Sequence, residues 1–234
     1  MLLNVLLRMS LQDDVVVNAL EATAKTASET TTLWELTLKG GWIMIPIAVL
    51  SIIAVYIFVE RFFAIRKAAQ MDENFMNRIN DYIHDGKIEP ALALCRATDS
   101  PIARMIEKGI QRIGRPLSDI NTAIENVGRL EVAKLERGLP ALATAAGGAP
   151  MLGFLGTVTG MVRAFHAMAV AQNIDITMLS SGIYEAMVTT VAGLVVGIIA
   201  YFAYNILVAN VAKVVNGLEA HTTEFMDLLN EPVK

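Results

Sequence analysis

Three long hydrophobic runs dominate the pattern of the chain. The first is Trp42–Val59, the second lies within 138–166 and the third within 182–212. At 1.5 Å of rise per helical residue, each run is about the length of one helix that spans the hydrocarbon core of a bilayer. The pattern therefore predicts three transmembrane helices.

The residues between the first and second runs have the charged, periodic pattern of helices in water. Ser100-Pro101 is a helix start, because serine caps a first turn and proline fits the first helical position. Gly86 and Gly114 are typical of helix ends, and Asp72 is a candidate cap for the first helix. Residues 66–137 are therefore predicted to form four helices.

The longest of these four helices is predicted to begin near Ser118. Its apolar positions keep an approximately helical period, which predicts one buried stripe. The stripe consists of Ile120, Ile124, Val127, Leu130 and Leu135.

The hydrophobic pattern predicts an all-α integral membrane protein with three transmembrane helices and long cytoplasmic helical extensions. The expected segments are a periplasmic N-terminal extension (1–41), transmembrane helix 1 (42–59), a cytoplasmic helical domain (60–137), transmembrane helix 2 (138–166), a short periplasmic connection (167–181), transmembrane helix 3 (182–212) and a cytoplasmic C-terminal helix (213–234).

Positive charges near the span ends predict this orientation. Arg61 and Lys67 follow the first span, Arg137 precedes the second and Lys213 follows the third, whereas residues 167–181 contain no lysine or arginine. Cytoplasmic flanks are enriched in these residues. The 66–137 segment and the C-terminus are therefore expected in the cytoplasm, and the N-terminus outside.

The composition agrees with a membrane protein, since 54% of the residues are hydrophobic. The net charge of −4 excludes the basic footprint of a nucleic-acid-binding protein. The single cysteine, Cys95, cannot form an internal disulfide, and we expect it to be a buried structural thiol.

Pro140 and Pro150 each remove a backbone donor from the second span and are expected to kink or locally end its helix.

Two spans carry faces of small residues at helical spacing. Gly153, Gly156, Thr157 and Gly160 form a continuous face on the second span, ending near Ala164. On the third span the corresponding face contains Thr189, Thr190, Gly193 and Gly197. In lipid, small residues allow helices to approach closely. Ordinary helix packing explains glycines at this spacing; the threonine hydroxyls also suit a narrow polar pathway or a surface for another helix.

Glu185 is the single glutamate inside the third span. A carboxylate facing lipid is costly, so we expect it to face protein or water. Glu185 also lies close to the outer end of the span, where hydration of the carboxylate is an alternative explanation for its presence. Arg163 is a candidate ion-pair partner, or equally an anchor whose long side chain reaches the interface.

Enzymatic and metal-binding motifs have no support in the sequence. His84, His166 and His221 are scattered without the spacing of metal ligands. The glycine-rich stretch 147–156 lacks the lysine of a phosphate-binding loop. We therefore expect a protein that is not an enzyme and needs no cofactor.

Two stretches carry a family resemblance. Residues 149–161 (APMLGFLGTVTGM) and 182–194 (GIYEAMVTTVAGL) resemble the second-span and third-span signatures of the MotA/TolQ/ExbB proton-channel family, most like its ExbB members. The resemblance covers the topology from about residue 33 to the C-terminus. It implies a homopentamer in the bacterial inner membrane, with the second and third spans lining a central pore.

The resemblance also implies partners and residue roles. A dimer of single-span ExbD-type proteins would lie in the pore and supply the proton-carrying aspartate, and the complex would energise a TonB-type transducer for import across the outer membrane. Thr157, Thr190 and Glu185, with Thr189 beside them, match the expected proton pathway. Two alternatives stay open, a TolQ-like subunit for envelope maintenance and a non-conducting membrane scaffold. A small solute transporter is disfavoured, because three spans show no internal repeat.

Overall fold

The computed structural model describes residues 41–70, 74–171 and 176–230. The expectations for the N-terminal extension before Gly41 and for Asp72 as a helix cap lie outside these residues. The described residues form seven α-helices and no strand. The helices are α3 (Met44–Ala69), α4 (Asn74–His84), α5 (Ile88–Ala97), α6 (Pro101–Ile110), α7 (Leu117–Glu136), α8 (Leu139–Ala171) and α9 (Ile176–Asn230).

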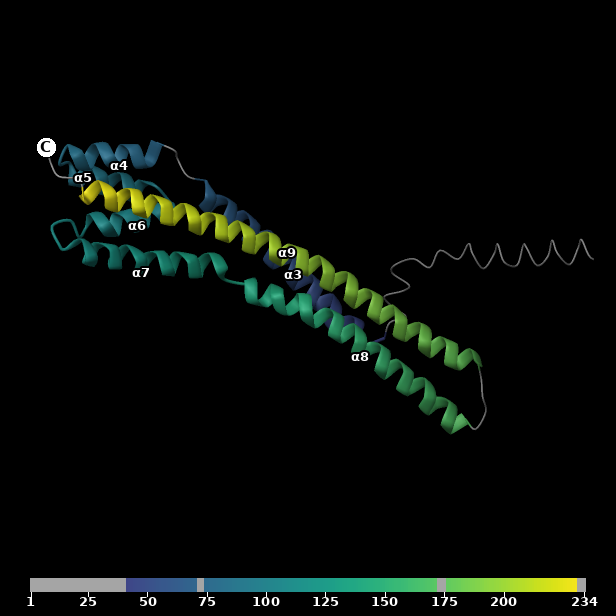
Figure 1. Ribbon diagram of the computed structural model, residues 1–234. Helices are drawn as coiled ribbons and strands as arrows, with labels where there is room; N and C mark the ends of the chain where they lie inside the picture. Colours follow the sequence, from purple (N-terminus) through teal and green to yellow (C-terminus); the bar gives the residue numbers. More distant parts are fainter. Residues whose placement is uncertain (1–40, 71–73, 172–175, 231–234) are drawn as a thin grey trace, which may run out of the picture.

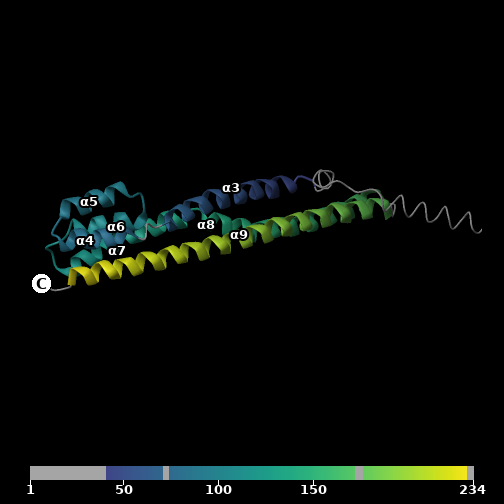
Figure 2. The same ribbon diagram turned by 90° about the horizontal axis from the view of Figure 1, so that it is seen from above.

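The molecule is an elongated rod built along α9 (Figure 1). Helix α9 has 55 residues, which corresponds to a length of roughly 80 Å. Helices α3 and α8 lie along one half of α9, and the four shorter or more polar helices α4–α7 gather around its C-terminal half, as Figure 2 shows from above.

Three helices are long and apolar enough to cross a membrane, which agrees with the prediction of three spans. These spans are α3 and the apolar parts of α8 and α9. Many of their large apolar side chains are exposed on the single chain, including Ile52 in α3, Phe154 in α8 and Phe202 in α9. An apolar surface of this kind needs lipid or other protein around it.

The hydrophobic core of the polar half forms around the end of α9. Phe225 is fully buried there, and Gly109 of α6 lies directly against its ring. A Cβ atom on Gly109 would lie 2.7 Å from Phe225 Cε1 and 2.8 Å from Ile124 Cδ1. This glycine therefore lets α6 and α7 approach α9 closely.

The predicted start of α6 is confirmed. Ser100 is the N-cap, its hydroxyl accepts a hydrogen bond from the N–H of Ala103 at 3.3 Å, and Pro101 occupies the first helical position. Gly114, with φ +93°, follows the end of α6 in a left-handed conformation, for which glycine has no steric penalty.

The predicted stripe on α7 is wrong at one position. Ile120, Ile124 and Leu135 are buried, but Leu130 is 64% exposed and its neighbour Glu131 is buried instead. At 100° per residue, Glu131 lies within 20° of Ile120 around the helix, whereas Leu130 lies about 80° away. Geometry, not side-chain polarity, decides which residue faces the core.

Helix α8 differs from the prediction in two respects. It continues through Pro150 without ending, and Pro140 lies in its first turn, where a missing N–H costs nothing. Gly138, with φ +88°, separates α8 from α7. Helix α8 also extends to Ala171 and α9 begins at Ile176, so most of the predicted 167–181 connection is helical.

Candidate functional site

Helices α8 and α9 run antiparallel and pack through their small residues. Gly153 of α8 faces Thr190 and Gly193 of α9, and Gly156 faces Thr189. One turn further along α8, Gly160 faces Ala186, and Gly182 in turn faces Ala164. Each step along α8 is matched by an equal step back along α9, so one register holds over the whole contact.

The backbones approach so closely that side chains would not fit between them. A Cβ atom on Gly193 would lie 2.5 Å from the carbonyl oxygen of Ala149, and one on Gly153 would lie 2.9 Å from the carbonyl oxygen of Thr189. Two helices approach each other this closely only where both present small residues.

Gly197 explains why α8 continues through a proline. It faces the ring of Pro150, and a Cβ atom at this position would collide with the ring Cγ and lie 3.0 Å from the carbonyl oxygen of Ala146. That carbonyl is the one whose usual helical donor, the N–H of residue 150, is missing. Because Gly197 has no side chain, α9 leaves room for the ring of Pro150 and for the carbonyl of Ala146.

The sequence allows two uses of the small faces, which are ordinary helix packing and the lining of a polar pathway or a surface for another helix. In the structure Gly153, Gly156, Gly160, Gly193 and Gly197 are buried against the opposite helix of the same chain. Matching small faces on two consecutive antiparallel spans pack best on each other, which leaves no space between them for a partner helix.

Two neighbouring threonines of α9 have different environments. Thr189 is 1% exposed, and its hydroxyl donates to the carbonyl of Ala186 at 2.7 Å, with that of Gly153 at 3.4 Å. Thr190 is half-buried and donates to the carbonyl of Gly153 at 2.9 Å. The side chain of Thr189 is therefore sealed inside the helix contact, whereas that of Thr190 lies at its edge.

Thr157 and Thr190 meet at the carbonyl of Gly153. In an α-helix the N–H of residue 157 donates to the carbonyl of residue 153, and Thr190 donates its hydroxyl proton to the same oxygen. The hydroxyl of Thr157, also half-buried, donates to the carbonyl of Phe154 at 2.6 Å. Both hydroxyl protons are committed to carbonyls, while both oxygens keep lone pairs that can accept from water.

Glu185 and Arg163 form an ion pair where the three spans meet. Arg163 Nη2 lies 3.6 Å from Glu185 Oε1, and the side chains are 55% and 32% exposed. This distance gives Coulombic attraction without a direct hydrogen bond. Gly41, just before α3, lies against the same carboxylate. The sequence gives no signal for Gly41, since the contact joins segments far apart in the chain.

Within the described residues, no group of three His, Cys, Asp or Glu side chains is placed to hold a metal ion. An apolar groove runs between α3 and α9, lined by residues such as Ala54, Phe58 and Phe202, with Ser51 as its one polar side chain. A site for a small molecule usually has several converging polar groups, so the groove does not define one.

The fold and this site define a class: an all-helical, three-span membrane protein whose second and third spans form a close antiparallel pair with threonines and one isolated acid. Residues 97–220 match the MotA/TolQ/ExbB proton channel family. The match covers more than half of the chain, and the chain belongs to this family.

Several relatives are similar in sequence to this chain over much of their length. An ExbB homolog of Methanothermobacter thermautotrophicus, described as a biopolymer transport protein, is 29% identical over 189 residues, which are 80% of this chain and 67% of that protein. The Tol-Pal system protein TolQ of Pseudomonas aeruginosa is 27% identical over 220 residues, which are 87% of this chain and 94% of that protein. The biopolymer transport protein ExbB of Neisseria gonorrhoeae is 28% identical over 134 residues, which are 51% and 61% of the two chains.

Proposed function

We propose that this chain is the channel-forming subunit of an inner-membrane complex that uses the proton motive force to energise import across the outer membrane. The observation that carries the proposal is that the hydroxyls of Thr157 and Thr190 donate to the neighbouring carbonyls of Phe154 and Gly153 on α8, about one turn beyond the single acid in the apolar part of α9, in a chain of the proton channel family. The complex is a homopentamer, with the N-terminus of each chain outside and the C-terminus in the cytoplasm.

The chemistry of the spans supports a partner that supplies the titrating group. Within the apolar parts of α3, α8 and α9, the described residues contain one Asp or Glu, Glu185, and one Lys or Arg, Arg163. Both lie at the same end of the spans. Threonine hydroxyls can order water, but they do not carry a proton at neutral pH. An ExbD-type partner with a membrane-embedded aspartate supplies the missing carrier.

The packing supports a location for that partner. Since the small faces of α8 and α9 are buried on each other, the partner contacts the remaining surface of the pair, where Thr157 and Thr190 are half-exposed. The membrane potential can drive the process, because one charge that crosses the membrane gains about 2.3 kcal/mol per 100 mV.

Substitutions at the neighbouring threonines test the pathway. Thr190→Val removes a hydroxyl at nearly constant volume, and the lost interhelical hydrogen bond costs only about 0.6 kcal/mol on average in membrane proteins. We therefore expect an assembled but inactive complex, while Thr190→Ser keeps activity. Thr189→Val is the matched control, and it should stay active because Thr189 lies outside the pathway. Full activity of both valine variants would contradict the proposal and favour a non-conducting scaffold.

A second candidate is the TolQ-type role in envelope maintenance, with a TolR/TolA-type set of partners. It is favoured by the match to TolQ of P. aeruginosa, which covers 94% of that protein. Deletion of the chain in its host separates the two roles. Loss of uptake of iron complexes with an intact envelope supports the TonB-type role, and leakage of periplasmic proteins or sensitivity to detergent supports the TolQ-type role.

A further inference from the structure

We propose that Arg163 is a positioning residue, which holds the Glu185 carboxylate at the place where the three spans meet. The inference rests on the proposed function, together with the expectation from the family resemblance that Glu185 lies on the proton pathway. It goes beyond that function by giving a role to an arginine that neither the sequence signatures nor the pathway requires.

The first observation is the isolation of the two charges. From residue 138 to residue 212, Arg163 is the only Lys or Arg in the sequence, and Asp175 and Glu185 are the only acids. Asp175 lies outside the described residues. Among the described residues of this stretch, Arg163 and Glu185 are therefore each other's only oppositely charged partner, at 3.6 Å.

The second observation is the contact of Gly41 with the pair. An added Cβ atom on Gly41 would collide with Glu185 Oε1, and it would lie 4.0 Å from Arg163 Nη2. Gly41 has φ +67°, a conformation that side chains disfavour. The carboxylate is thus confined between the start of α3 on one side and the guanidinium group of α8 on the other.

Exposure of the pair decides between a stabilising and a positioning role. The arginine side chain is 55% exposed and the glutamate side chain 32% exposed, and solvent weakens the attraction between charges in such surroundings. The pair therefore contributes little to holding α8 and α9 together, which the buried small faces already do. Its specific effect is to fix where the negative charge lies, about one helical turn from Thr189 and Thr190.

An anchor role for Arg163 makes a different prediction from a positioning role. An arginine that only reaches for the interface acts independently of Glu185, so its removal has the same effect whatever residue stands at 185. A positioning residue acts through Glu185, so its removal has no further effect once the carboxylate is gone.

The test uses the full-length chain expressed from its own locus, in the host in which deletion has identified its activity. Arg163→Gln, Arg163→Lys, Glu185→Gln and the Arg163→Gln/Glu185→Gln double variant are compared for complex assembly, energised activity and thermal unfolding midpoint. Arg137→Gln, at the C-cap of α7 just before the start of α8, is the matched control for loss of an arginine.

We expect Arg163→Gln to assemble normally and to lose activity about tenfold or more, the scale of effect produced by misplacing a functional group. Arg163→Lys should keep most of the activity. Arg163→Gln should shift the unfolding midpoint by at most about one or two degrees, because the exposed pair contributes little to stability. It should cause no further loss of activity in the Glu185→Gln background.

Three results overturn the inference: wild-type activity of Arg163→Gln, equal loss of activity in Arg163→Lys and Arg163→Gln, or a further loss of activity when Arg163→Gln is added to the Glu185→Gln variant. Activity of Glu185→Gln is read separately. If Glu185→Gln is inactive while Arg163→Gln is fully active, only the role of Arg163 fails. If Glu185→Gln is fully active, the expectation that Glu185 lies on the pathway fails, while the proposed roles of Thr157 and Thr190 are untouched.

Discussion

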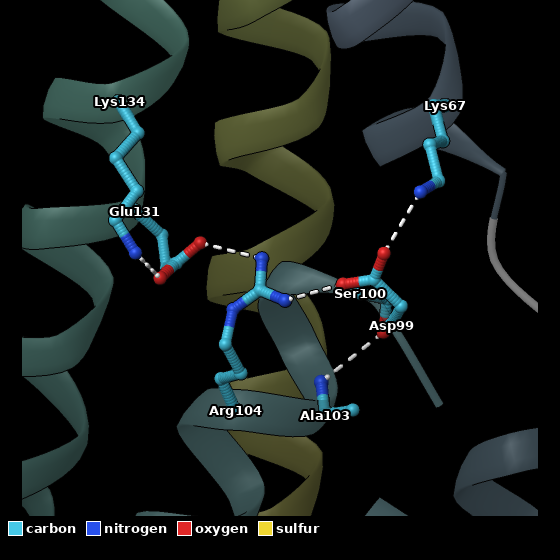
Figure 3. A network of polar contacts seen from close by, with 7 residues as sticks. All are labelled: Lys67, Asp99, Ser100, Ala103, Arg104, Glu131 and Lys134. Carbon is cyan, nitrogen blue, oxygen red and sulfur yellow. Dashed lines mark hydrogen bonds and ion pairs between the residues drawn. The ribbon is translucent and has the colours of Figure 1, made fainter. Parts of the chain in front are cut away.

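A buried carboxylate on α7 offers a sharp test of the physical argument. The side chain of Glu131 is only 5% exposed, and it is bound by two cations. Arg104 Nη2 of α6 lies 2.7 Å from Oε2, and Lys134 Nζ lies 2.6 Å from Oε1. Arg104 also contacts Asp99 at 2.9 Å. Figure 3 shows this network, which continues from Asp99 to Lys67 of α3.

The substitution Glu131→Gln keeps the shape of the side chain and removes its charge. Breaking a fully buried ion pair costs about 3–5 kcal/mol, and an exposed pair contributes about 0–1 kcal/mol. Arg104 is 39% exposed and keeps Asp99 as a partner, so an intermediate cost of about 1–3 kcal/mol is expected. For a protein of this size that lowers the unfolding midpoint by roughly 2–4 °C per kcal/mol.

The pH dependence of the effect has a defined sign. Burial raises the pKa of Glu131, but hydrogen bonds from Arg104 and Lys134 outweigh burial, so the pKa lies below its ordinary value. A carboxyl group whose pKa is lower in the folded state contributes stability above its unfolded pKa of about 4.3, and this contribution is lost as the pH falls through the folded value. The difference between wild type and Glu131→Gln should therefore be full at pH 7 and shrink below about pH 4.

The assay is thermal unfolding of the purified chain in detergent, followed by the circular dichroism of its helices from pH 7 down to pH 3. Glu125→Gln is the matched control, since Glu125 lies on the same helix and its pair with Arg129, at 3.8 Å, is exposed. The control should shift the midpoint by at most one or two degrees. Equal shifts in Glu131→Gln and Glu125→Gln, or a Glu131→Gln effect that is independent of pH, would refute the reasoning.

Three further predictions concern packing, the free thiol and a helix cap. Gly156→Leu should disrupt the α8–α9 contact, because an added Cβ atom collides with Thr189, while Gly147→Leu should be tolerated, because nothing lies within 4 Å of that position; recovery of folded protein from membranes measures both. The Cys95 thiol, whose pKa burial raises to about 12, should react with a maleimide at pH 7.5 far more slowly in the folded than in the denatured protein, and equal rates would contradict its burial. Ser100→Ala should lower the unfolding midpoint by a few degrees, since losing an N-cap costs about 1 kcal/mol, and an unchanged midpoint would show that the cap is unimportant.

The sequence predicts the spans and the α6 cap well because both depend on local chemistry. A run of apolar residues has few alternatives to crossing a bilayer, and Ser100-Pro101 fixes a helix start through its own side chains. The long-range features were less accessible. Nothing in the sequence indicates that Gly41 lies against Glu185, or that Gly197 accommodates the ring of Pro150.

The stripe on α7 shows a different reason for error. The apolar pattern places Leu130 on the buried face, although strict helical geometry favours Glu131. The presence of Arg104 on α6, ready to pair with a buried carboxylate, makes the polar residue acceptable there. Such compensation between helices is visible only once α6 and α7 are placed side by side.

The register of α8 against α9 is the feature on which the functional interpretation depends most. Thr189 and Thr190 are adjacent in the sequence and chemically identical, yet a rotation of 100° between them separates a sealed side chain from a half-exposed one. The family resemblance points to Thr190, and the structure gives a physical reason for the distinction. The carbonyl of Gly153 accepts the hydroxyl of Thr190 at the edge of the contact, next to Thr157. A shift of α9 by one residue would bury Thr190 and expose Thr189, so the glycines that fix the register also determine which hydroxyl can meet water.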